Sequence, residues 1–179
     1  MDEKEIARLV RQAVFAYSDQ PNQQKASGIK KENSGTYEIT SITLSAARRL
    51  IRKVEQKAEQ MGLSVVAAVS NSAARLVAVE CMDDSYIASY DIATGKAYTV
   101  VALKMPTTDL KQLCQPGAPL YGLQQTNEGK IVIFGGGVPL WYHGRLIGGL
   151  GVSGGSEEQD TLLAEYGASV LEEAVSCAE

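Results

Sequence analysis

The sequence predicts an α/β domain in which a five-stranded antiparallel sheet is flanked by helices. Apolar residues recur at helical spacing in two long segments, and five short apolar runs bounded by turn residues are candidate strands. Strands joined by short turns pair antiparallel, and the predicted order is helix, two strands, helix, three strands, helix. Hydrophobic residues make up 45% and charged residues 21% of the 179 residues, which is typical of one globular domain.

The first predicted helix covers 43–61 and ends at Gly62, because glycine is common just past a helix C-terminus. Strands are expected at 63–70 and 76–82, and a second helix at 85–103 ends near Pro106. Residues 105–129 are expected to form a long loop, which in a compact domain is usually functional or an oligomer contact. The buried stripe of the first helix is predicted to contain Leu44, Ala47, Ile51, Val54 and Ala58.

A strand at 130–134 is predicted to precede a hairpin formed by 138–142 and 145–152. The two-residue turn of this hairpin is His143-Gly144, where glycine can supply a positive φ. The final helix is expected to begin after Ser156, because Gln159 completes a capping box with it. Three glycines in the second hairpin strand predict close packing or a bulge: Gly148, Gly149 and Gly151.

Two active-site patterns overlap in this hairpin, and neither has the context that its chemistry needs. Residues 149–154 match G-x-G-x-x-G, but only one helix follows, with no second parallel strand. Residues 151–155 match G-x-S-x-G, but the sole histidine, His143, precedes Ser153 by ten residues, whereas the hydrolase order puts the histidine last. Gly95-Lys96 resembles the end of a P-loop but lacks the upstream glycine, so nucleotide binding there is rejected.

The N-terminal segment predicts a second unit, separate from the domain at 36–179. Residues 1–17 form an amphipathic helix, and the polar residues 18–35 are typical of a flexible linker. A helix this short is marginal alone and needs a partner surface, either another protein or the chain's own domain or oligomer. The predicted partner-binding stripe consists of Ile6, Leu9, Val10, Ala13, Val14 and Tyr17.

Five ordered segments resemble the GlcG/HbpS family, which includes the C-terminal domain of PduO. They read ITLSAARRLIRKVEQKAEQMGLSVVAAVSN, RLVAVECMDDS, GKAYTVVALKMPT, LYGLQQTNEGKIVIFGGGVPL and GRLIGGLGVSGGSEEQD. The resemblance implies a profilin-like five-stranded antiparallel sheet, homo-oligomers such as octamers, and haem or a related tetrapyrrole in some members. The chain departs from the family at residues 71–75, which replace the usual Asp/Asn-Gly-rich turn, and at His143, where an acidic residue is common.

The residues that this resemblance makes candidates for cofactor binding fall into two groups. Gly135, Gly136 and Gly137 offer a backbone that a flat ligand could approach closely. Haem iron needs an axial ligand, normally His, Cys, Met or Tyr. The candidate ligands are Tyr98, Met105, Cys114 and His143, with His143 and Cys114 as the candidate metal ligands; core or turn positions remain the alternative for these side chains.

The N-terminal helix and linker resemble the encapsulation peptides of bacterial microcompartment proteins, in the run EIARLVRQAVFAY. This resemblance implies docking on a shell protein or on other cargo.

We therefore predict a cytoplasmic, microcompartment-associated protein that binds haem or a corrinoid-related tetrapyrrole. The alternative is a small reductase or aldehyde-handling enzyme that uses the glycine-rich cleft. A net charge of −4 argues against a nucleic-acid partner, and no apolar run is long enough to predict a membrane partner.

Overall fold

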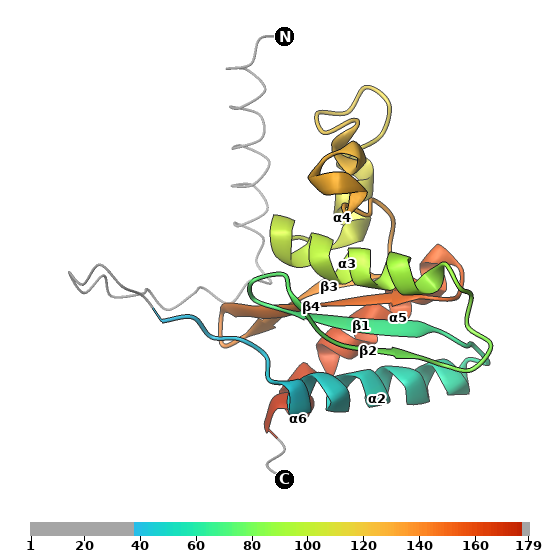
Figure 1. The fold of residues 1–179 in the computed structure, drawn as a ribbon, viewed down its shortest axis with the longest axis vertical. Helices are drawn as coiled ribbons and strands as arrows, with labels where there is room; N and C mark the ends of the chain where they lie inside the picture. Colours follow the sequence, from blue (N-terminus) through green and yellow to red (C-terminus); the bar gives the residue numbers. More distant parts are fainter. Residues whose placement is uncertain (1–37, 177–179) are drawn as a thin grey trace.

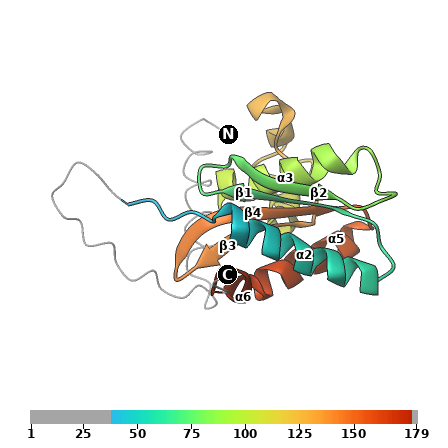
Figure 2. The same cartoon turned by 60° about the horizontal axis from the view of Figure 1, so that its bottom comes forward.

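The computed structural model describes residues 38–176, and a four-stranded antiparallel sheet forms its middle layer. The strand order is β2-β1-β4-β3, with β1 at Val66–Asn71, β2 at Leu76–Cys81, β3 at Gly137–Tyr142 and β4 at Arg145–Ser153. Helix α3 (Ser89–Leu103) covers one face of the sheet. Helices α2 (Leu44–Gln60), α5 (Glu157–Ser169) and α6 (Leu171–Ser176) cover the other face (Figures 1 and 2). The predicted helix 1–17 and linker 18–35 lie outside the described residues.

The prediction of a fifth strand is wrong. Residues 130–134 pair with no strand of the sheet and lie against α3 instead. The amide nitrogen of Val132 donates to Thr99 Oγ1 at 2.9 Å, and a Cβ on Gly95 of α3 would lie 2.7 Å from Val132 Cγ2. Residues with high strand propensity are stabilised mainly by burial of their side chains. The apolar residues 130–134 can therefore be stabilised by packing on a helix as well as by pairing in a sheet.

Helix α2 has the N-terminus and C-terminus that the sequence predicts. The Thr43 side chain accepts from the amide of Ala46 at 3.2 Å, which satisfies one free donor of the first turn. Gly62 has φ +68°, and the amides of Gly62 and Leu63 donate to the carbonyls of Glu59 and Ala58, as in a Schellman motif. The buried stripe differs at its start, since Leu44 is exposed and Leu50 is buried.

Helix α3 packs directly on the glycines of β4. A Cβ at Gly149 would lie 2.6 Å from the carbonyl oxygen of Ala97, and one at Gly151 would overlap the carbonyl oxygen of Ala93. Ser70 of β1 adds a buried hydrogen bond of 2.6 Å to the same Ala97 carbonyl. The glycines of β4 therefore allow close packing between the helix and the strand, which is one of the two roles that the sequence predicted for them.

The expected long loop 105–129 contains regular structure of its own. It begins with α4 (Thr107–Leu113) and continues through two single-turn 3₁₀ helices, η1 (Leu123–Gln125) and η2 (Asn127–Gly129). Their side chains close over a small second core, which also receives residues from the segment after them. Its buried members are Met105, Leu110, Cys114 and Ile131.

The hairpin and the final helix confirm two local predictions. His143 and Gly144 have φ values of 48° and 72°, which are the two positive values of a type I′ turn, and Tyr142 pairs with Arg145 across it. Ser156 caps α5, with both hydrogen bonds of the capping box to Gln159 present. The final helix is split near Val170, after which α6 begins.

Candidate functional site

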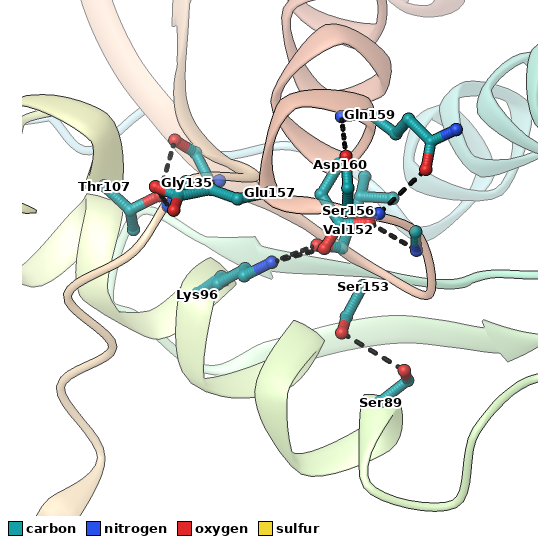
Figure 3. Close-up of polar contacts among 12 residues, drawn as sticks. Ser89, Lys96, Thr107, Gly135, Val152, Ser153, Ser156, Glu157, Gln159 and Asp160 are labelled. Carbon is teal, nitrogen blue, oxygen red and sulfur yellow. Dashed lines mark hydrogen bonds and ion pairs between the residues drawn. The ribbon is translucent and has the colours of Figure 1, made fainter.

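A lysine in α3 is completely buried beside an aspartate of α5. Lys96 Nζ lies 2.9 Å from Asp160 Oδ2 and donates to the carbonyl oxygen of Val152 at 2.7 Å (Figure 3). The ring of Phe134 lies 5.0 Å from the same nitrogen. Burial lowers the pKa of Lys96, and the nearby Asp160 carboxylate opposes that change.

The glycine-rich loop 135–137 closes over this pair. A Cβ at Gly136 would lie 2.6 Å from Lys96 Nζ and 2.8 Å from the Val152 carbonyl oxygen, and its φ of +103° suits glycine. The Gly135 amide donates to Glu157 Oε1 at 2.9 Å (Figure 3). The Gly137 amide donates to Thr107 Oγ1 at 2.9 Å. All three glycines are buried, so the backbone that we expected a flat ligand to approach is covered by the chain's own side chains.

The N-terminus of α5 holds the acidic members of this cluster in place. Asp160 Oδ1 accepts from the Gly155 amide at 2.9 Å, and Glu157 Oε2 lies 2.6 Å from Lys111 Nζ of α4. The hydrogen bond from Lys111 and then the one from Gly135 lower the pKa of Glu157. The cluster therefore joins α3, α4, α5 and the glycine loop, and it can fix their arrangement.

Sequence reasoning rejected the Gly95-Lys96 pair as a P-loop and did not assign Lys96 another role. A signal was available, because Lys96 falls on the apolar stripe of its helix with Ala93, Ala97 and Val100, at the spacing i, i+3, i+4, i+7. A lysine at a core position needs a buried partner, and Asp160 in the first turn of the last helix was a candidate.

The structure places Ser153 and His143, the serine and histidine considered for the G-x-S-x-G pattern, far from each other. The Ser153 hydroxyl donates to Ser89 Oγ at 3.2 Å in a buried position (Figure 3). His143 lies in the turn just before the nine-residue strand β4, and Ser153 is the last residue of that strand. The two side chains therefore lie at opposite ends of β4, too far apart for His143 to act as the base of Ser153 within one chain.

A groove of about 460 Å³ lies beside α3. Its walls come from α3, from the turn between β1 and β2, and from residues 129–132. The lining is mixed, with apolar and aromatic surface and charged groups at the rim; this volume falls in the range of small-molecule sites. The lining includes the side chains of Arg75, Leu76, Asp91, Tyr98, Lys130 and Val132.

Comparison with known proteins decides the family. A family model described as "Haem degrading protein HbpS-like" matches residues 42–169. The chain belongs to the HbpS-like family. This HbpS-like chain is 46% identical over 128 residues to the "Uncharacterized 15.0 kDa protein in dhaT-dhaS intergenic region" of Citrobacter freundii, covering 72% of the chain and 90% of that relative.

Two further comparisons connect the HbpS-like chain to PduO. It is 41% identical over 125 residues to the corrinoid adenosyltransferase PduO of Citrobacter freundii, and the match covers 70% of the chain but 37% of PduO. The solved structure of a PduOC:haem complex matches with a TM-score of 0.71 and 37% identity, covering 78% of this chain and 98% of that one. The resemblance to the PduO C-terminal domain is confirmed.

The predicted axial ligands of the HbpS-like chain lie in three different places. Tyr98 lines the groove, and its hydroxyl accepts a hydrogen bond of 3.0 Å from Asn127. Met105 and Cys114 are buried in the second core, and burial raises the pKa of the Cys114 thiol, which disfavours the thiolate that binds metals. His143 is exposed in the hairpin turn and contacts Tyr142, with ring centroids 4.1 Å apart.

These positions separate His143 from the other candidates. His143 follows the last residue of β3, whereas Gly137 is the first residue of that six-residue strand, so His143 and Gly137 lie about 20 Å apart at the usual rise per residue.

Among residues 38–176, the structure has no group of three or more His, Cys, Asp or Glu side chains that could hold a metal ion. In the same range, no helix has the length and apolar character needed to span a membrane.

Proposed function

We propose that this chain is a tetrapyrrole-binding protein that takes haem, or a related ring, into the groove beside Tyr98. The observation that carries the proposal is the match to the PduOC:haem complex, which extends over 98% of that chain at 37% identity. The groove supports it, because tyrosine is an established axial ligand of haem iron and Tyr98 alone among our four candidate ligands lines this groove. Haem would supply a redox-active iron there.

The side chains around the groove fit such a ring. Leu76 and Val132 provide apolar surface in the groove, and Val132 packs directly on Gly95 of α3. The hydrogen bond from Asn127 orients the Tyr98 hydroxyl within the wall. Apolar walls with a few placed polar groups are the usual composition of a cofactor site.

The alternative function, a small reductase or aldehyde-handling enzyme, receives less support from this geometry. Its glycine-rich cleft is filled, and the Lys96 amino group has no exposed surface and is held by Asp160 and Val152. A lysine nucleophile must reach its carbonyl substrate, so this arrangement favours a structural role for Lys96.

The test is a haem titration of the full chain, followed by absorption in the Soret region. We expect saturable binding in the wild type, and a changed spectrum with weaker binding in Tyr98→Phe. His143→Ala and Cys114→Ser serve as controls and should bind as the wild type does, because neither residue lines the groove. Absence of saturable binding would refute the proposed function, and a spectrum lost in His143→Ala would refute the assignment to Tyr98.

We also propose that residues 1–17 direct this protein into a bacterial microcompartment by docking on a shell protein or another cargo protein. The proposal rests on the apolar stripe that contains Leu9 and Val10. A fluorescent protein fused to residues 1–35 should concentrate in compartments when co-expressed with shell proteins, and Leu9→Glu should abolish this. Diffuse fluorescence of the unaltered fusion would contradict it.

Homo-oligomerisation, including an octamer, is proposed from the family resemblance. Sedimentation velocity of the full chain measures it, and a monomer across the micromolar range would refute it.

A further inference from the structure

The groove carries two positive side chains whose charges are not fully compensated. Arg75 and Lys130 both line it. The pKa of Lys130 is raised mainly by its hydrogen bond to Glu128, and the positive charge of Arg75 acts in the opposite direction, so the two cations lie within electrostatic reach of each other. Two cations at one rim are expected where a negatively charged ligand binds.

In the part of the chain that the structure describes, Arg75 is held in position by its backbone and not by an ionic partner. It ends the turn between β1 and β2, where Asn71 Oδ1 accepts from the amides of Ala73 and Arg75 at 3.0 Å each. Within residues 38–176, the Arg75 guanidinium makes no hydrogen bond or ion pair. The turn thus fixes the point from which the Arg75 side chain reaches the groove.

Within residues 38–176, neither of the two acidic groups near the groove, Asp91 and Glu128, forms an ion pair with Arg75. Glu128 lies 2.6 Å from Lys130, but the two side chains are 82% and 57% exposed, and solvent screening makes an exposed pair of this kind weak. Asp91 lines the groove in the first turn of α3, seven residues before Tyr98, which is about 10 Å along the helix. A ligand carboxylate can therefore bind Arg75 and exchange with Glu128 at Lys130.

We infer that Arg75 and Lys130 make the groove selective for tetrapyrroles with free carboxylates, such as haem and protoporphyrin, over corrinoids, whose peripheral carboxyl groups are amides. The inference rests on the proposed function and resolves the choice between haem and corrinoid that it leaves open. Leu76, Tyr98 and Val132 provide the surface for the ring, and the two cations bind the acidic edge.

The test uses metal-free protoporphyrin IX and its dimethyl ester, so that iron ligation by Tyr98 does not contribute. Binding to the full chain is followed by porphyrin fluorescence. We expect the wild type to bind the diacid about tenfold or more tighter than the diester, because charge-assisted hydrogen bonds are lost with the ester. The Arg75→Gln/Lys130→Gln variant should bind both porphyrins with similar affinity, and hydroxocobalamin should not compete in the wild type.

A matched control changes the same number of charges on the opposite face of the sheet. Arg48 and Arg52 are exposed on α2, and Arg48→Gln/Arg52→Gln should keep the wild-type preference for the diacid. Equal affinity of the wild type for diacid and diester, or a preference that survives in Arg75→Gln/Lys130→Gln, would overturn the inference while leaving tetrapyrrole binding in place. Failure of both porphyrins and of haem to bind would overturn the proposed function itself.

Discussion

The buried pair of Lys96 and Asp160 leads to a quantitative prediction about stability. Their side chains are 0% and 5% exposed, and 2.9 Å separates Lys96 Nζ from Asp160 Oδ2. Lys96→Met keeps most of the buried volume but leaves the Asp160 carboxylate with the Gly155 amide as its remaining donor. Breaking a buried pair from one side typically costs about 3–5 kcal/mol, and we expect the free energy of unfolding to fall by about that amount.

The assay is urea unfolding at pH 7, followed by circular dichroism. The double variant Lys96→Met/Asp160→Asn should regain part of the loss, because a neutral amide can still accept from Gly155 and leaves no unpaired charge. Lys57→Met on α2 is the control and should change the free energy of unfolding by less than about 1 kcal/mol. A loss below about 1 kcal/mol in Lys96→Met, or no recovery in the double variant, would refute the reasoning.

The same lysine predicts a dependence of stability on pH. Because burial lowers the pKa of Lys96 below its ordinary 10.5, the unfolded chain binds more protons than the folded chain between the two values. The free energy of unfolding contributed by this group therefore rises with pH in that window. Comparing wild type and Lys96→Met from pH 8 upward isolates the contribution, and a difference that stays constant with pH would contradict the lowered pKa.

Four other substitutions test an ion pair, the packing and the local conformations. Lys111 lowers the pKa of Glu157, so this carboxylate stabilises the fold above its ordinary pKa of 4.5 and loses the contribution as the pH falls; Glu157→Gln should weaken the acid dependence of urea unfolding. Gly151→Ala should cost about 2–3 kcal/mol because a Cβ overlaps backbone of α3, whereas Gly62→Ala, with open space but a positive φ, should cost about 1 kcal/mol. Gly144→Ala should lower the thermal midpoint, because the turn requires φ of 72°; an unchanged midpoint would contradict the turn assignment.

Local signals in the sequence were sufficient for the elements whose ends are set by single residues. Thr43, Gly62 and Ser156 mark helix ends through capping chemistry, and His143-Gly144 marks a hairpin through the φ values that it tolerates. The partners in each of these interactions lie within a few residues of each other, so a short stretch of sequence is enough to predict them.

The number of strands and the site could not be predicted in the same way, because both depend on contacts distant in sequence. The run 130–134 has strand composition, but its neighbour in space is α3, some thirty residues earlier. Lys96 and Asp160 are 64 residues apart, and neither forms a recognisable motif. Arg75 and Lys130 meet at one groove only because the turn between β1 and β2 and the segment after η2 both reach α3.

The lack of sheet pairing at 130–134 gives the two long walls of the groove different mechanical properties. Helix α3 is packed against the sheet through glycines, so it moves only if the core opens. The other wall, residues 130–134, is attached by two hydrogen bonds of the Thr99 hydroxyl, one from the Val132 amide and one to the Lys130 carbonyl oxygen, and by side-chain packing. Segments held by so few bonds open locally at a lower free energy than global unfolding. The groove can therefore widen to admit a rigid ring without breaking any strand pairing, and a bound ring that bridges both walls would slow amide hydrogen exchange at Val132.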